Sequence, residues 1–176
     1  RADSDGCMST NDTVVLMSSG ASAQRPDQGE FTHALTAVCH SLAQQLITDA
    51  EGASHDIAIT TVGAATETEA EDVSRTVARS NLFKTAVFGN DPNWGRVLSA
   101  VGTTDAQFDP DRIDVTINGV TVCRNGAIGD PREGVDLAAS RAVDVLIDLK
   151  AGDASATVWT NDLTHNYVEE NSAYSS

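Results

Sequence analysis

Three polar stretches of the 176-residue chain carry the side chains that could bind or transform a small molecule. Residues 9–13 read Ser-Thr-Asn-Asp-Thr, residues 49–52 read Asp-Ala-Glu-Gly, and residues 161–176 are rich in asparagine, serine, glutamate and tyrosine. Carboxylates of this kind bind cationic groups, while amides and hydroxyls both donate and accept hydrogen bonds. The stretches therefore predict a polar small-molecule site with anionic side chains, which another chain could complete.

The common catalytic and nucleotide-binding motifs are missing from the sequence. It has no Gly-x-x-x-x-Gly-Lys loop, no dinucleotide-binding glycine pattern and no Gly-x-Ser-x-Gly turn. No pair of histidines has the spacing of metal ligands. Residues 3–6 begin like a calcium loop, but the bidentate acid that should close such a loop is absent. We therefore expect no metal site and no catalytic set that is complete within this chain.

The charge balance argues against two classes of partner. The chain has 26 acidic and 11 basic residues, a net charge of −15. Nucleic acids and anionic membranes attract clustered lysine and arginine, and here these residues are few and dispersed. No apolar run approaches the length of a membrane span. We expect neither a nucleic-acid nor a membrane partner.

The cysteines and the first residues bear on the origin of the chain. Cys7, Cys39 and Cys123 are far apart and form no Cys-x-x-Cys pair, which favours a reducing, cytoplasmic location over a disulfide framework. Residues 1–6 are not a signal peptide and include no initiator methionine. We expect the chain to begin inside a longer precursor.

The first hundred residues are expected to alternate helices with short strands. Apolar residues spaced by three or four positions indicate helices, and short apolar runs indicate strands. The expected elements are strands at 14–17, 55–62 and 82–88 and helices at 31–47 and 66–81. Asp91 as an N-cap and Pro92 in the first turn predict a further helix that ends at Gly102.

The second half of the chain is expected to be mostly antiparallel. Strands at 113–117 and 120–123 flank Asn118-Gly119, a pair typical of a type I′ hairpin turn. A second hairpin is expected to join 142–149 to 155–160.

Together these elements predict a single α+β unit over residues 1–176. A mixed α/β, sandwich-like lobe would cover about residues 1–105, and a smaller, mostly antiparallel β lobe about 106–160. The C-terminal tail is expected to be ordered, so the second lobe with its tail runs over 106–176.

Two of the polar stretches have both a structural and a functional interpretation. Acids at a helix C-terminus are electrostatically unfavourable, so Asp49 and Glu51 are either simply solvated or one of them faces a cationic ligand. The tail is either frayed, as chain ends commonly are, or it folds back to line a polar pocket.

Four motifs carry a resemblance to a known family. They are Ser-Thr-Asn-Asp-Thr at 9–13, Asp-Ala-Glu-Gly at 49–52, Lys-Thr-Ala at 84–86 with Asn-Asp-Pro-Asn-Trp-Gly-Arg at 90–96, and Tyr-Val-Glu-Glu-Asn-Ser-Ala-Tyr-Ser-Ser at 167–176. In this order they resemble the β-chain of ornithine acetyltransferase, the bifunctional glutamate N-acetyltransferase of arginine biosynthesis. The resemblance spans essentially the whole chain.

The resemblance implies an acetyl transfer that proceeds through a covalent intermediate. Members of this family are made as a precursor that cuts itself before a threonine, and the new N-terminal threonine takes the acetyl group from N-acetylornithine and passes it to glutamate. The α-chain of the same precursor supplies oxyanion-hole donors, and two αβ units form a heterotetramer. The reaction needs no cofactor, and acetyl-CoA remains open as an alternative acetyl donor.

The resemblance also implies that this chain lacks the nucleophile. The Ala-Thr junction should lie upstream of Arg1, so we expect no catalytic residue in the chain and no activity from it alone. Glu51, Asn171 and Ser176 are implied to bind substrate, because they occupy the family's binding positions. The roles of Asn11, Asp12 and Arg96 stay open at this point.

Two readings compete with the acetyltransferase. A non-catalytic acidic domain that binds a small molecule or another protein would also lack a nucleophile. A related self-processing aminopeptidase is disfavoured by the terminal motif.

Overall fold

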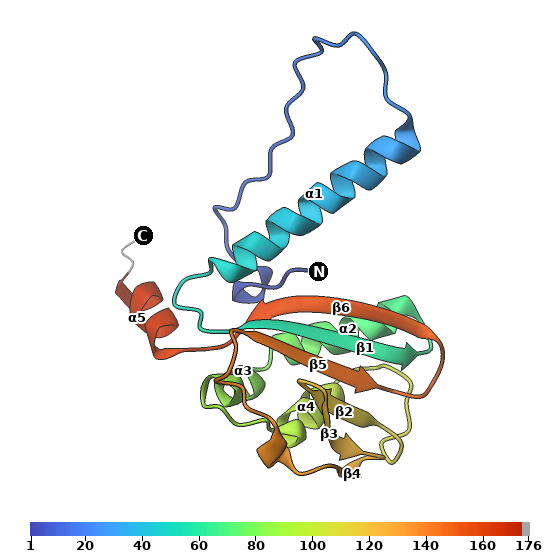
Figure 1. The fold of residues 1–176 in the computed structure, drawn as a ribbon, viewed down its shortest axis with the longest axis vertical. Helices are drawn as coiled ribbons and strands as arrows, with labels where there is room; N and C mark the ends of the chain where they lie inside the picture. Colours follow the sequence, from blue (N-terminus) through green and yellow to red (C-terminus); the bar gives the residue numbers. More distant parts are fainter. Residues whose placement is uncertain (174–176) are drawn as a thin grey trace.

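The computed structural model describes residues 1–173, which form an α+β fold around one six-stranded mixed sheet (Figure 1). The strand order is β4-β3-β2-β5-β1-β6. The strands are β1 (Asp56–Ala64), β2 (Asp114–Ile117), β3 (Val120–Arg124), β4 (Ala127–Ile128), β5 (Ala142–Asp148) and β6 (Ala154–Asn161). The helices are α1 (Gln28–Thr48), α2 (Glu67–Ala78), α3 (Asn81–Phe88), α4 (Trp94–Val101) and α5 (His165–Ala173), with short 3₁₀ turns η1 (Asp5–Cys7) and η2 (Arg132–Gly134).

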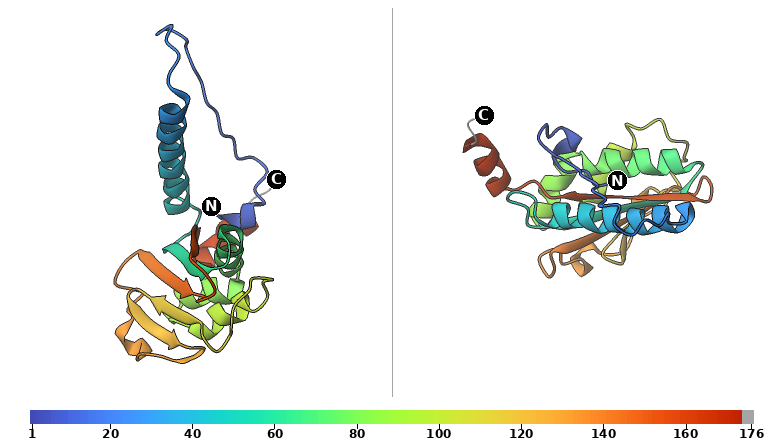
Figure 2. Two further views of the ribbon diagram at one scale, coloured as in Figure 1. Left: turned by 90° about the vertical axis from the view of Figure 1, so that its right-hand side faces the viewer. Right: turned by 90° about the horizontal axis from the view of Figure 1, so that it is seen from above.

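One face of the sheet is covered by helices and contains the core. Helix α2 lies across β1 and β6, and α3 and α4 continue the same layer (Figures 1 and 2). In β5 the burial alternates, so that Val143, Val145 and Ile147 point into this layer while Leu146 is exposed on the other face. Such alternation is expected of a strand with one face on the core and one toward solvent.

Several elements are as the sequence predicted. Helix α1, helix α2 and strand β1 are confirmed within a few residues of their expected bounds. The β2–β3 hairpin is also confirmed, with positive φ angles of 45° at Asn118 and 83° at Gly119, as a type I′ turn requires. The conformation of these segments is determined by local sequence signals, so the sequence alone predicts them correctly.

The expected hairpin between 142–149 and 155–160 is wrong, because β1 lies between β5 and β6. Strand β1 pairs in parallel with β5 and antiparallel with β6. The connection between them bonds to the end of β1 instead of closing on itself. The Ala151 and Gly152 N–H groups donate to Gly63 O at 2.7 and 2.8 Å. A buried central strand needs partners on both sides, and it takes them from the neighbouring segments.

The expected strand at 82–88 is also wrong, since these residues form helix α3. Phe83, Ala86 and Val87 are buried, and their spacing of three and four residues matches a helix face. The Ser80 side chain caps the helix by accepting a hydrogen bond from Phe83 N at 3.2 Å. A short apolar run does not distinguish the two conformations by itself.

The next helix starts later than predicted. The N-cap of α4 is Asn93, whose side chain accepts from Arg96 N at 3.1 Å, so Asp91 and Pro92 lie before the helix. The Asp91 carboxylate instead accepts a hydrogen bond from Asn93 Nδ2 at 2.8 Å and so orients the capping side chain.

The expected strand at 14–17 has no regular structure, although its residues are apolar. Its side chains are 66–92% exposed, and a strand is stable only when it pairs with another strand. Helix α1 projects beside this segment, away from the sheet (Figures 1 and 2). Its apolar stripe of Phe31, Val38, Leu42 and Leu46 is 46–69% exposed. This part of the molecule therefore presents a large apolar surface to its surroundings.

The proposed boundary between two lobes at about residue 105 stays a prediction, although strands from both sides of it share the sheet. The expectation of an ordered tail holds as far as Ala173, where helix α5 ends. No helix within residues 1–173 combines the length and the apolar character that crossing a membrane requires.

Candidate functional site

An acidic pocket of about 350 Å³ lies where the N-terminal segment meets the end of α1. It joins two of the three polar stretches found in the sequence. Its acidic and hydroxyl-bearing residues are Ser4, Asp5, Ser9, Asp12, Asp49 and Glu51. All the residues that line it belong to the described part of the chain, and none of them is a lysine, arginine or histidine. The pocket therefore offers a concentration of negative charge with no basic residue among its described lining.

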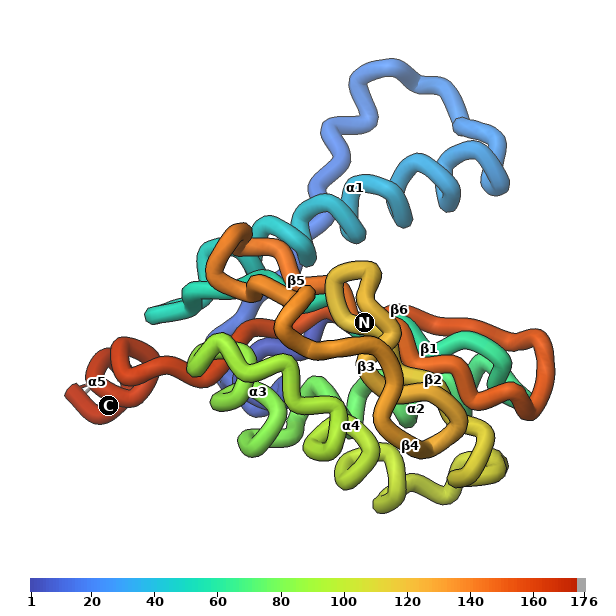
Figure 3. The backbone as a smooth tube through the Cα atoms, turned by 60° about the horizontal axis from the view of Figure 1, so that its bottom comes forward, coloured from blue at the N-terminus to red at the C-terminus, as the bar shows by residue number. Residues whose placement is uncertain are grey.

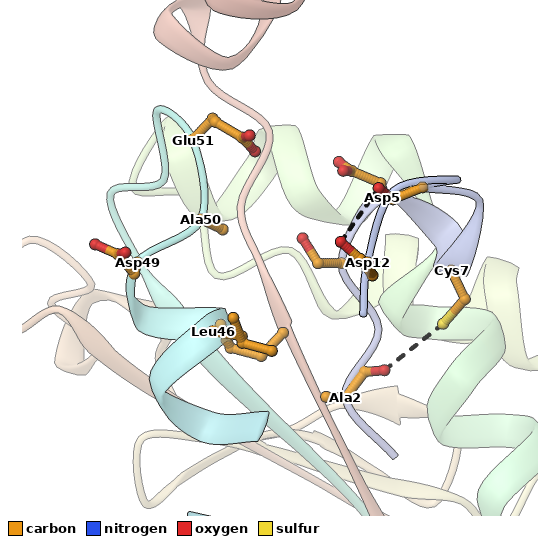
Figure 4. A pocket seen from close by; sticks show the side chains of 11 residues that line it. Ala2, Asp5, Cys7, Asp12, Leu46, Asp49, Ala50 and Glu51 are labelled. Atoms are coloured by element: carbon orange, nitrogen blue, oxygen red, sulfur yellow. Dashed lines mark hydrogen bonds between the residues drawn. The ribbon is translucent and has the colours of Figure 1, made fainter. Parts of the chain in front are cut away.

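Glu51 stands on the turn that follows α1. The helix ends at Thr48, and Asp49 N–H still donates to Gln45 O at 3.0 Å before the chain turns. The Glu51 carboxylate is turned across the pocket toward that of Asp5, whereas the carboxylate of Asp49 points away from it (Figure 4). Of the two acids whose role the sequence left open, Glu51 is thus the one placed to bind a ligand here.

The turn is held by close contact with the start of α5. Gly52 has a φ angle of +63°, and a Cβ at this position would collide with the Tyr167 amide nitrogen. The Thr164 hydroxyl donates to Gly52 O at 2.6 Å and accepts from Tyr167 N at 2.9 Å. Only glycine combines this backbone conformation with such a close approach. The backbone beside Glu51 is therefore fixed by the first turn of α5.

Tyr167 connects the same helix to the other side of the pocket. Its hydroxyl donates to Asp5 Oδ1 at 2.8 Å. Burial, together with the negative charges of Asp5 and Glu51, raises the pKa of Tyr167 to about 12. The phenol is therefore neutral and remains a donor at physiological pH. Through it, the third polar stretch is also brought to the acidic pocket.

A second polar cluster, formed by Ser54, His55 and Asp162, joins the start of β1 to the end of β6. The carboxylate of Asp162, which is 2% exposed, accepts from Ser54 N and His55 N at 2.9 Å each and from the Ser54 hydroxyl. His55 Nδ1 lies 2.8 Å from the same carboxylate. Burial opposes ionisation of Asp162, but the hydrogen bonds from His55 and Ser54 outweigh it and lower its pKa.

The residue types of this cluster are those of a catalytic triad, but the geometry is different. In a triad the histidine nitrogen that does not face the acid contacts the serine hydroxyl. Here His55 Nε2 lies 3.1 Å from the backbone oxygen of Leu137, and the Ser54 hydroxyl donates its hydrogen bond to Asp162. The cluster therefore has a structural role, because it joins the start of β1, the end of β6 and the loop that contains Leu137. No sequence spacing reveals this cluster, because Asp162 lies 108 residues from Ser54 and 107 from His55.

The remaining residues singled out in the sequence have different positions. Asn171 is exposed on α5, where its side chain donates to Tyr167 O at 3.0 Å, and it does not line the acidic pocket. Ser176 lies outside the described residues. Asp12 lines the pocket and accepts from the Ser9 hydroxyl at 3.3 Å, while Asn11 accepts from the Thr10 hydroxyl at 3.2 Å. The substrate-binding roles of Glu51, Asn171 and Ser176 stay predictions.

Arg96 has a structural position. Its Nη1 donates to Leu82 O at 2.6 Å and to the Thr85 hydroxyl at 3.3 Å. The side chain therefore joins α4 to α3.

The fold and the pocket define an α+β protein with an acidic pocket. Comparison with known proteins narrows this class, because residues 1–176 match the model of the ArgJ family. The chain belongs to this family.

The relatives are named for arginine biosynthesis. The arginine biosynthesis bifunctional protein ArgJ of Streptomyces coelicolor is 63% identical over 176 residues, which are 100% of this chain and 46% of that protein. The protein of the same name from Thermobifida fusca is 62% identical over 175 residues, which are 99% of this chain and 45% of that protein. This chain thus spans about half the length of its curated relatives.

A solved structure agrees with the fold. The crystal structure of arginine biosynthesis bifunctional protein argJ from Bacillus halodurans matches with a TM-score of 0.89 at 34% identity, covering 99% of this chain and 86% of that one.

Proposed function

We propose that this chain is part of an acetyltransferase of arginine biosynthesis that moves an acetyl group from N-acetylornithine to glutamate. Family membership and the names of the relatives support arginine biosynthesis as the setting. The observation that carries the proposal is the acidic pocket, whose described lining residues include the acids Asp5, Asp12 and Glu51 and no basic residue. Ornithine has a side-chain ammonium group, the kind of ligand that such a pocket attracts.

Glu51 is the group that we assign to this ammonium. Its carboxylate faces the pocket, and the turn that carries it is fixed by Gly52 and α5. A hydrogen bond between charged groups contributes about 1.5–3 kcal/mol when it is partly shielded from water. Asn171 and Ser176 would act from the tail, where an amide and a hydroxyl can bind both the amine and the carboxylate of an amino acid.

The chemical step requires a nucleophile from outside this chain. We propose that an N-terminal threonine, released by self-cleavage of a longer precursor, attacks the acetyl carbonyl of N-acetylornithine. Ornithine leaves, and the resulting acetyl-threonine is then attacked by the amine of glutamate. The present chain contributes the binding of the amino acid in this scheme. Acetyl-CoA as an alternative donor, the absence of a resident cofactor, and a cytoplasmic location belong to the same proposal.

The exposed apolar surface supports a protein partner. The stripe on α1 and the segment 14–17 flank a groove of about 690 Å³ that also includes Cys39 and Ala43. Apolar surfaces of this extent mark protein–protein contacts. We propose that the α-chain of the same precursor covers this surface and that two such units associate as a heterotetramer.

The test compares the isolated 176-residue chain with the same chain co-produced with the segment that completes its relatives' length. We expect the complete protein to form N-acetylglutamate from N-acetylornithine and glutamate, and the isolated chain to form none. Turnover by the isolated chain would contradict the external nucleophile. A complete protein that forms no product would instead favour a non-catalytic binding domain.

A further inference from the structure

A second cavity, of about 300 Å³, lies between α3, α5 and the N-terminal segment. Helices α3 and α5 are found at the same end of the molecule, as the tube in Figure 3 shows. Lys84, Arg79, Asp3, Asp5 and Tyr167 are among its lining residues. Its volume is at the lower end of the range of about 300–1,000 Å³ that small-molecule sites occupy.

Lys84 is the unusual member of this lining. It is half-buried, and its ammonium group forms no salt bridge or hydrogen bond with any residue between 1 and 173. The other lysine of the chain, Lys150, is satisfied, because its Nζ lies 2.7 Å from Asp114 Oδ2 and donates to Asn125 Oδ1 at 3.0 Å. A lysine that is partly withdrawn from water loses hydration, and here it gains no direct hydrogen bond within the described residues in exchange.

The acids in the cavity are already engaged with other groups. Asp3 is buried, and its Oδ2 accepts from Arg75 Nη1 and Arg79 Nε at 2.9 Å each. Asp5 Oδ1 accepts from the Tyr167 hydroxyl. The donors left unused are therefore the ammonium of Lys84 and the terminal nitrogens of Arg79, which make no side-chain hydrogen bond within residues 1–173. Arg75 is also paired with Glu71, whose Oε1 lies 2.7 Å from its Nη2, so Lys84 is the cation of this group that lacks a direct partner within residues 1–173.

We propose that this cavity binds the carboxylate group of a small organic acid through Lys84, with Arg79 at its rim. A carboxylate accepts charge-assisted hydrogen bonds from both side chains and restores the interactions that the buried ammonium lacks. Burial lowers the pKa of Lys84, against the attraction of Asp3, Asp5 and Asp162, so an anion placed beside it would raise that pKa again. The binding requires no acetyl transfer and no second chain.

The two cavities share one residue. Asp5 lines both the acidic pocket and the Lys84 cavity. A ligand that carries an amine and a carboxylate, such as an amino acid, would place its amine in the acidic pocket and its carboxylate in the Lys84 cavity. Propionate carries only a carboxylate, putrescine carries only amines, and glutamate carries both. The three probes therefore separate the contribution of the carboxylate to binding from that of the amine.

The small number of lysines makes a direct test simple, because Lys84 and Lys150 are the only two in the sequence. The 176-residue chain is labelled with ¹³C at its lysines, and the two side-chain signals are followed by NMR as each probe is added. We expect propionate and glutamate to shift the Lys84 signal to saturation and to leave the Lys150 signal in place. Putrescine should not produce this shift.

Lys84→Met removes the charge at nearly constant volume but also removes the Lys84 signal, so its glutamate binding is measured by titration calorimetry. We expect this binding to be about tenfold weaker or more. Arg25→Gln, which removes one exposed positive charge far from the cavity, is the matched control and should change nothing. A response to glutamate alone also supports the site and shows that the amine is required. A Lys84 signal that moves no more than that of Lys150 with any acid would overturn the proposal, even if the methionine variant failed to fold.

Discussion

Replacement of Glu51 by glutamine is the sharpest perturbation of the acidic pocket. The change removes one negative charge and keeps the shape of a side chain that faces Asp5 across the cavity. Because Glu51 is exposed, the lower end of the energy of a charged hydrogen bond applies, about 1.5 kcal/mol. A difference of about 1.4 kcal/mol is a factor of ten. We therefore expect Glu51→Gln to raise the KM for N-acetylornithine about tenfold.

The assay is steady-state acetyl transfer to glutamate by the complete protein. An effect on KM alone indicates binding that is equal in the ground and transition states, whereas an equal fall in kcat and kcat/KM would place the interaction in the transition state. Glu133→Gln, the same change at an exposed acid in η2, is the control and should leave both constants as they are. If Glu51→Gln changes neither constant, Glu51 is only a solvated acid at a helix end.

Three further predictions concern the contacts around the pocket. Gly52→Ala should destabilise the fold by about 2 kcal/mol or more in urea unfolding, because the methyl group meets Tyr167 N and the φ angle is positive; an unchanged midpoint would refute the close contact. Tyr167→Phe should lower the free energy of unfolding by about 1 kcal/mol, because it removes the hydrogen bond to Asp5. This contribution is fully present below the unfolded pKa of about 10 and is lost as the pH rises through the folded pKa of about 12. Equal stabilities of the wild type and the variant at neutral pH would contradict it. Asp162→Asn should lower the free energy of unfolding by about 3 kcal/mol at neutral pH. The greater stability of the wild type is present above the unfolded pKa of Asp162 and should be lost as the pH falls through its lowered folded pKa. A difference in stability that does not change with pH would count against the ionised carboxylate.

Local signals account for what the sequence predicted correctly about the fold. The Asn118-Gly119 pair determines its own turn, and α2 is delimited by the Thr66 cap and by acids in its first turn. The failures have a common cause in long-range partners. Strand β1 enters between β5 and β6 although it precedes both by about eighty residues or more, and the segment 14–17 lacks a partner strand within residues 1–173.

Only part of the candidate site can be predicted from the sequence. Glu51 was marked by its unfavourable position after a helix, and the structure places it in the acidic pocket. The contact between Tyr167 and Asp5 spans 162 residues, and that between His55 and Asp162 spans 107, so no spacing rule could reveal them. Lys84 interrupts an apolar run that is typical of a strand. Its burial without a direct partner within residues 1–173 depends on the packing of α3 against its neighbours, which the sequence does not show.

The central claim is that the acidic pocket holds the ammonium group of ornithine. The most direct measurement is a crystal structure of the complete protein with ornithine bound. We expect the side-chain nitrogen of ornithine at about 2.7–3.2 Å from a carboxylate oxygen of Glu51. An ornithine whose ammonium group lies outside the pocket, with Glu51 in contact only with water, would contradict it.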